Sequence, residues 1–185
     1  MYRVFGFVAT VALGATLVFA ADAPAPSVSK IFDRDVSSVE REVVSLAEAM
    51  PADKFEFAPT NGEFKTVRTF AQQMRHIAAT NYAVAASILG EKSPVEYGSD
   101  ENGPATIKSK DDIVKFLKDS FAYTHKAVAT VTDQNLTEMI ASPFGKNKVP
   151  RLSMVTVPAW HSFDHYGQAV VYARMNGIIP PASRR

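Results

Sequence analysis

The sequence predicts an all-α fold, an antiparallel up-down four-helix bundle, on the basis of three observations. Apolar residues recur at helical spacing in four long segments, capping residues, glycines or prolines bound these segments, and no segment shows the alternation of a convincing strand. The chain has 185 residues, of which 46% are hydrophobic and 21% are charged. This length and composition suit one globular domain with a complete core, which we place at residues 31–183.

The first two helices are predicted at residues 31–50 and 67–89. In the first, apolar residues at helical spacing alternate with acidic ones, and Pro51 follows where a helix would have to end. Residues 52–65 are rich in turn-forming types and are predicted to form a loop. Thr66 is the expected N-cap of the second helix.

The third helix is predicted at residues 110–131. Ser109 and Asp112 have the spacing of a capping box, with aspartate in place of the usual glutamate. The long connection before it, residues 91–109, contains several glycines and prolines. A connection of this length could cross the bundle or cover its mouth.

The fourth helix is expected to begin near Ser153 or Thr156 and to end near residues 176–177. Pro158 fits an early-turn position, and an Asn-Gly pair is a favoured helix end. The preceding residues 142–151 contain glycine and two prolines and are predicted to be a loop.

Residues 1–23 have the pattern of a secretory signal peptide and its cleavage region. Arg3 supplies the positive charge, residues 4–19 form an apolar run without charge, and cleavage is expected after Ala20 or Ala23. The alternative is an uncleaved anchor, although this run of about 16 residues is shorter than the roughly 20 of a typical spanning helix. The mature protein is therefore expected to be exported, periplasmic or secreted, with no membrane contact after cleavage.

Residues 24–30 are predicted to be a flexible leader of the mature chain. The formal net charge of +1 gives no overall attraction to nucleic acid, so no nucleic-acid partner is expected. The chain has no cysteine. This excludes disulfides, a thiolate nucleophile and every cysteine-type metal site, and leaves histidine, aspartate and glutamate as ligands for a metal.

His161 and His165 stand four positions apart, so in a helix their side chains lie one turn apart on the same face. Two imidazoles placed in this way can share one metal ion, and His76 in the second helix is the best candidate for a third ligand. Three nitrogen ligands with an open fourth position describe a catalytic zinc site. The alternative is that these are bundle histidines satisfied by hydrogen bonds.

Two polar residues near these histidines could orient a ligand. Asp164 could do so through its carboxylate, or it could be a solvated helix charge. Gln168 could hold a ligand through its amide, or it could form an ordinary bundle hydrogen bond. Ser162 stands where zinc peptidases have a glutamate general base, so peptidase chemistry is not expected. His125 is interpreted as a partly exposed surface residue, with a fourth ligand as the alternative.

The run Trp-His-Ser-Phe-Asp-His-Tyr-Gly-Gln at residues 160–168, the run Tyr-Ala-Arg-Met-Asn-Gly-Ile-Ile-Pro-Pro at 172–181, and the helix with His76 together resemble the DinB/YfiT-like superfamily. The resemblance covers roughly residues 30–183 and is most specific in its C-terminal part. It implies an up-down four-helix bundle in which His76, His161 and His165 bind a divalent ion, zinc, nickel or a similar metal such as iron or manganese. Homodimers are common in this superfamily, so one is expected.

The resemblance also implies a function, because some members are thiol transferases or isomerases that use a low-molecular-weight thiol. We therefore expect an exported metal-dependent enzyme, thiol-transferase-like or hydrolytic, that acts on a small-molecule substrate or thiol. Neither the substrate nor the catalytic residues follow from the sequence. The alternatives are a non-catalytic exported protein that binds or senses a metal, and a structural bundle whose histidines bind nothing.

Overall fold

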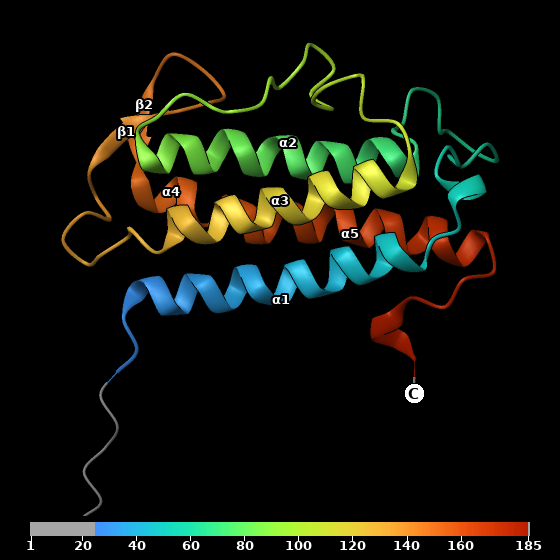
Figure 1. Cartoon of the computed structure of the whole chain (residues 1–185), viewed down its shortest axis with the longest axis horizontal. Coiled ribbons are helices and arrows are strands. Elements are labelled where there is room, and N and C mark those ends of the chain that lie inside the picture. The colour runs from blue at the N-terminus through green and yellow to red at the C-terminus, as the bar shows by residue number, and fades with distance from the viewer. Residues whose placement is uncertain (1–24, 185) are drawn as a thin grey trace, which may run out of the picture.

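A computed structural model describes residues 25–184 of the chain (Figure 1). Four long helices pack together, which confirms the predicted four-helix bundle: α1 (Val28–Ala49), α2 (Phe70–Leu89), α3 (Lys110–Val128) and α5 (Val157–Met175). The signal peptide and cleavage region predicted at residues 1–23 lie outside the described residues. Within the described part of the chain, none of the helices combines the length and the apolar character that crossing a membrane requires.

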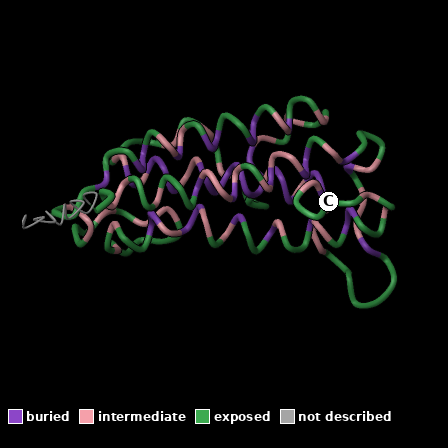
Figure 2. Tube along the Cα trace, turned by 90° about the horizontal axis from the view of Figure 1, so that it is seen from below, coloured by how far each residue is buried: buried purple, intermediate pink, exposed green. Residues whose placement is uncertain are grey.

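Each helix of the bundle packs against two others. Both α1 and α2 contact α3 and α5. Buried positions follow the inward faces of the helices along the length of the bundle (Figure 2). Fully buried side chains from the four helices, such as Val39, Ile77, Leu117 and Ala173, form one continuous core.

The direction of the helices departs from strict alternation at one connection. Residues 90–109 cross the bundle from the end of α2 to the end where α2 began, so α2 and α3 run in the same direction (Figure 1). The hydroxyl of Tyr123, late in α3, accordingly donates to the Glu91 carboxylate just after α2, at 2.6 Å. The chain order is therefore up, down, down, up, and the crossing connection lies over α2, beside the candidate site.

The observed helix starts follow the caps that form hydrogen bonds. The second helix begins at Phe70 rather than at residue 67, because Thr69 and Gln72 form a reciprocal capping box. Thr66, the expected cap, has a left-handed backbone with φ of 67°. The first helix begins at Val28, inside the predicted leader, because the Ser27 hydroxyl accepts a hydrogen bond from the backbone of Lys30. The predicted cap at Ser109 is confirmed.

The fourth long helix, α5, begins after Thr156, one of its two expected starts, and α4 (Arg151–Val155) is a separate short helix before it. Pro158, in the first turn of α5, has no N–H to donate to the carbonyl four residues earlier, which ends the preceding helix. Before α4, β1 (Met139–Ala141) and β2 (Lys148–Pro150) form an antiparallel hairpin. The prediction of a loop at residues 142–151 was therefore wrong for β2, because strands this short carry almost no periodic signal.

The hairpin is held against the end of α2. The Arg151 guanidinium donates to the backbone carbonyl of Ile88, near the C-terminus of α2, and to the Glu138 carboxylate at 2.9 Å. The Ser87 hydroxyl donates to the carbonyl of Ala141 at 2.5 Å. These contacts fix the hairpin beside the C-terminal end of α2. Short 3-10 turns at Ala52–Lys54 (η1) and Pro181–Ser183 (η2) complete the described structure.

Candidate metal centre

Three histidines converge between α2 and α5. His76 lies on α2, and His161 and His165 lie one turn apart on α5. Candidate ligand atoms of the three side chains all lie within 4.8 Å of one another. His76 and His165 are buried and His161 is half-buried. The structure thus brings together the three residues that the sequence singled out.

The ring of His76 is oriented by the crossing connection. Its Nδ1 lies 2.7 Å from the backbone carbonyl of Glu101. A carbonyl oxygen only accepts, so Nδ1 carries the proton and, in the neutral ring, Nε2 carries the lone pair. Glu101 has a left-handed backbone with φ of 61°, which is uncommon for a residue other than glycine. The connection is therefore held in an unusual conformation at the residue that contacts His76.

Two arginines fasten this connection to the bundle. Arg68 donates to the Asn102 side-chain oxygen at 2.9 Å and to the Glu101 carboxylate at 3.1 Å. Arg75, on α2 next to His76, donates to the carbonyl of Pro104 at 3.0 Å. Asn102 is 4% exposed and also donates to the Asp100 carboxylate. The carbonyl that orients His76 thus belongs to a segment attached at several points.

The ring of His165 is oriented by a chain of side chains that ends in a carboxylate. Nδ1 of His165 lies 2.5 Å from Oε1 of Gln73, Nε2 of Gln73 donates to Oε1 of Gln168 at 3.0 Å, and Nε2 of Gln168 donates to the Asp164 carboxylate at 3.2 Å. A carboxylate can only accept, so it fixes the orientation of both amides. His165 must then donate from Nδ1, which leaves the lone pair on Nε2.

This chain shows how the two predicted orienting residues are placed. Gln168 reaches His165 only through Gln73, and Asp164 is exposed and accepts from Gln168. Gln73 is the residue that contacts His165, and it was not among the site residues predicted from the sequence. Its position one turn before His76 on α2 was a usable signal. Glu101 contributes through its backbone, for which the sequence holds no comparable signal.

His161 is held differently from the other two. Its Nε2 lies 3.1 Å from Nε2 of His76. Its Nδ1 is buried and has no hydrogen-bond partner among the described residues. The exposed indole of Trp160 packs edge-on to its ring, with centroids 5.9 Å apart. His161 is thus held by packing and by its contact with His76, and among the described residues no group outside the cluster forms a hydrogen bond with its ring.

Burial keeps the three imidazoles neutral. It lowers the pKa of His161 to about 3, and the neighbouring His165 and His76 add to this effect. It lowers the pKa of His165 to about 4, with a further contribution from His76. Burial also lowers the pKa of His76, although the hydrogen bond to Glu101 opposes the shift. At neutral pH each ring therefore offers a lone pair.

The donor set fits a divalent transition metal. Neutral imidazole nitrogens are favoured ligands for zinc, nickel and similar ions. Zinc-to-nitrogen bonds of about 2.0–2.1 Å in a tetrahedral site place the nitrogens about 3.4 Å apart. The 3.1 Å between the Nε2 atoms of His76 and His161 is close to that value. Two lone pairs at this distance repel each other unless a proton or a cation lies beside them.

His125 lies in another part of the bundle. On α3, its Nδ1 is 2.5 Å from the Asp33 carboxylate and its Nε2 is 3.0 Å from the Glu40 carboxylate, both on α1. It is half-buried, as predicted for a partly exposed residue. Both of its ring nitrogens are engaged away from the cluster, which excludes the alternative of a fourth ligand in this arrangement.

Comparison with known proteins gives a family and a fold. The model of a family described as the DinB superfamily matches residues 36–169. The search of curated proteins gave no significant match.

Solved structures with similar folds share little sequence with this chain. A DinB-like protein from Bacillus cereus is 19% identical, with a TM-score of 0.63 over 82% of this chain and 95% of that one. A DinB-like protein from Bacillus subtilis is 20% identical, with a TM-score of 0.62 over 84% and 99%. A conserved protein from Enterococcus faecalis is 14% identical, with a TM-score of 0.64 over 82% and 98%. At these identities the likeness establishes the fold alone.

Proposed function

This chain belongs to the DinB superfamily, and we propose that it is a metal-dependent enzyme in which His76, His161 and His165 bind one divalent transition-metal ion. The observation that carries the proposal is the convergence of three buried or half-buried imidazoles, of which two present Nε2 lone pairs fixed by hydrogen bonds at Nδ1. Zinc and nickel suit this donor set, and iron and manganese are further candidates.

We assign the enzyme to thiol transfer or a related thiol-dependent reaction. A bound divalent ion favours the thiolate form of a small thiol or lowers the pKa of a bound water. Hydrolysis is commonly assisted by a general base within reach. Among the described residues, the nearby carboxylates are already engaged: Glu101 with Arg68, and Asp164 with Gln168. Activation of a thiol needs no such base, so the site favours it over hydrolysis.

The protein's own groups perform three tasks in this proposal. The Glu101 carbonyl and the Gln73 amide hold the rings of His76 and His165 at one angle. The surrounding core excludes water from these two ligands. Exposed Trp160 and half-buried His161 leave that side more open to an incoming molecule. We further propose that the protein acts outside the cytoplasm, on the basis of the sequence pattern of residues 1–23.

A second function, non-catalytic metal binding or sensing, is favoured by one observation. His76 is 4% and His165 is 8% exposed, so much of the site is closed to solvent. The two functions differ in whether a fourth coordination position exchanges freely. With the cobalt-loaded protein, added azide would shift the visible absorption bands if that position is open and would leave them unchanged if it is closed.

Elemental analysis of protein purified without chelator or affinity tag tests the proposal. We expect about one equivalent of a transition metal in the wild type and its loss in His76→Ala, His161→Ala and His165→Ala. His125→Ala is the matched control and keeps the metal, because His125 is bonded to carboxylates elsewhere. Failure of the wild type to take up zinc, nickel, iron or manganese would overturn both functions.

A further inference from the structure

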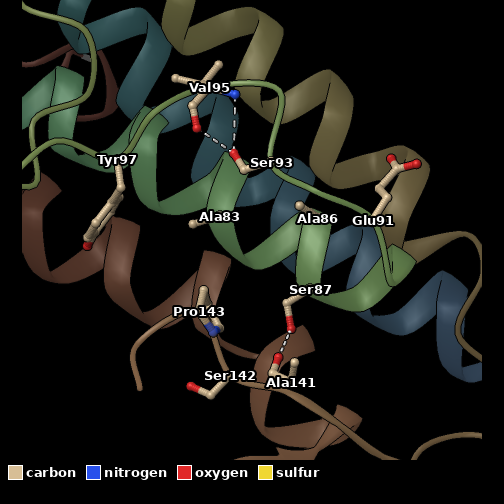
Figure 3. Close-up of a pocket in the computed structure, with 10 residues that line it drawn as sticks. All are labelled: Ala83, Ala86, Ser87, Glu91, Ser93, Val95, Tyr97, Ala141, Ser142 and Pro143. Carbon is tan, nitrogen blue, oxygen red and sulfur yellow. Dashed lines mark hydrogen bonds between the residues drawn. The ribbon is translucent and has the colours of Figure 1, made fainter. Parts of the chain in front are cut away.

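A groove continues the α2 face on which His76 lies. Thr80, Ala83 and Ser87 follow His76 at helical spacing on the same side of α2. A cavity of about 300 Å³ lies over the last two of these, between the crossing connection and the hairpin segment at residues 141–143 (Figure 3). The small side chains Ala83 and Ala86 on the floor leave this space unfilled. The volume is at the lower end of the range for small-molecule sites.

Tyr97 joins this groove to the three histidines. It lines the groove on the crossing connection. Its ring centroid lies 6.4 Å from that of His76, and its hydroxyl lies 3.3 Å from the Thr80 hydroxyl, one turn after His76. The half-exposed ring of Phe144 packs on the outer side of Tyr97, with centroids 6.3 Å apart. Tyr97 therefore stands between the histidines and the groove, and a molecule that occupies both must move its hydroxyl away from buried Thr80.

The polar groups of the groove carry no free charge. The Ser87 hydroxyl donates to the carbonyl of Ala141, which leaves its oxygen as an acceptor, whereas the Ser93 hydroxyl both donates to the carbonyl of Val95 and accepts from its N–H (Figure 3). Among the described residues that line the groove, only Glu91 is charged. Its carboxylate accepts from Tyr123 at 2.6 Å and lies 3.6 Å from the Lys126 ammonium.

We propose that this groove, which we call the α2 groove, binds the tail of the substrate whose reacting head lies at the three histidines, and that it selects an uncharged, mainly apolar tail with a hydrogen-bond donor. This inference rests on the proposed function and names its substrate class. Ala83 and Ala86 admit the apolar part by being small. The hydroxyl oxygen of Ser87 accepts from the donor. An anionic tail would lose its hydration without finding a cation among the described residues that line the groove.

Cobalt-loaded protein provides the test, because a thiol that reaches the ion changes its visible spectrum. The probes are 2-mercaptoethanol, 6-mercaptohexan-1-ol and 6-mercaptohexanoate. Burial of each added methylene favours binding, so we expect the six-carbon alcohol to bind at least tenfold more tightly than 2-mercaptoethanol. The carboxylate of the same length is expected to bind at least fivefold more weakly than the alcohol.

Two substitutions fill the α2 groove from opposite walls, Ala83→Leu from α2 and Ser142→Leu from the hairpin. Both are expected to keep one equivalent of cobalt and to reduce the preference for the six-carbon alcohol to within about twofold. Ala122→Leu, at an exposed position of α3, is the matched control and keeps the preference. The use of two walls ensures that a folding defect in one variant does not decide the outcome.

The outcomes separate the groove from the metal site. The wild-type cobalt protein could bind short and long thiols equally, or the alcohol and the carboxylate equally. Either result would overturn the proposed role of the α2 groove and leave the metal site unaffected. A preference that persists in both filled variants would do the same. Absence of cobalt binding by the wild type would overturn the proposed function, and the groove assignment with it.

Discussion

His125 and His161 both project from long helices of one bundle, but their neighbours differ in charge. His125 lies between the carboxylates of Asp33 and Glu40. His161 lies among other imidazoles, with a buried and unbonded Nδ1. Burial lowers the pKa of His125, but the two carboxylates more than offset this and raise it above the ordinary value, whereas burial lowers the pKa of His161 to about 3. The same side chain is thus favoured as a cation between α1 and α3 in one place and as a neutral metal ligand in the other.

Only a histidine with an available lone pair can bind a metal ion. A ring bonded to carboxylates at both nitrogens has no lone pair to give. A neutral ring anchored at Nδ1 by a carbonyl or an amide presents the other nitrogen, as His76 and His165 do.

Zinc is expected to stabilise the protein through the triad of His76, His161 and His165 and not through His125. At a free zinc concentration about 1,000 times Kd, mass action adds about 4 kcal/mol to the free energy of unfolding. For a chain of this size that corresponds to a rise of about 10 °C in Tm. Differential scanning calorimetry should show this rise in the wild type and in His125→Ala, and none in His165→Ala. A rise that persists in His165→Ala would contradict the assignment of the ligands.

Acid is expected to destabilise the metal-free protein through the triad. The lowered pKa values of His161, about 3, and His165, about 4, mean that the unfolded chain binds more protons than the native one below pH 6.5. This contribution to stability is complete above pH 6.5 and is lost as the pH falls through the native pKa values. The slope is on the order of 1.4 kcal/mol per pH unit for each histidine.

Urea unfolding between pH 7 and pH 4.5 measures this slope. His161→Gln and His165→Gln should each make it shallower. His125→Gln is the control and should not, because the pKa of His125 is shifted in the opposite direction. An unchanged slope in both triad variants would show that these histidines do not titrate as their burial requires.

Removal of the Gln73 amide is expected to weaken metal binding while the ligands remain. Gln73→Leu leaves the Nδ1 proton of His165 without its acceptor and should reduce zinc affinity about 10- to 100-fold. Competition with a chromophoric chelator measures this affinity. Asp164→Asn is the matched control, because its side-chain oxygen can still accept from Gln168, and the affinity should stay within about threefold of the wild type. Equal losses in the two variants would argue against a specific role for Gln73.

The smallest effect is expected at His125. A raised pKa stabilises the native state fully below the unfolded pKa of about 6.5, and this stabilisation is lost as the pH rises through the native value. His125→Gln should therefore cost about 0.5–1 kcal/mol at pH 5.5, as is usual for a partly exposed ion pair, and less at pH 9. Chemical unfolding of both proteins at the two pH values measures the difference. A larger loss of stability at pH 9 than at pH 5.5 would contradict the assignment of a protonated His125.

The fold was predictable because it depends on periodicity. Four amphipathic segments and the cap at Ser109 located the helices to within a few residues. The start of α5 after Thr156, with Pro158 in its first turn, was one of the two expected starts, whereas the separate α4 and the short hairpin were not predicted, because elements this short lack a periodic pattern. Thr66 and Thr69 both suit the N-cap of the second helix, and only the reciprocal hydrogen bonds between Thr69 and Gln72 distinguish them.

The three histidines of the candidate site were predictable from the sequence, but the groups that orient them were not. The spacing of His161 and His165 on one helix face is a local property of the sequence. The contact of His165 with Gln73 depends on how α2 and α5 are rotated against each other, which spacing does not determine. The contact of His76 with the backbone of Glu101 depends on the path of the crossing connection, and any residue type has that carbonyl.

The contact between His76 and His161 joins residues 85 positions apart. An ion bound there would tie the second helix to the last across a loop that contains α3 and the hairpin. In a chain without cysteine, such an ion would take the place of a covalent cross-link. Unfolding would then require the ion to leave first, so the loaded protein should unfold slowly even under conditions in which the unfolded state is favoured.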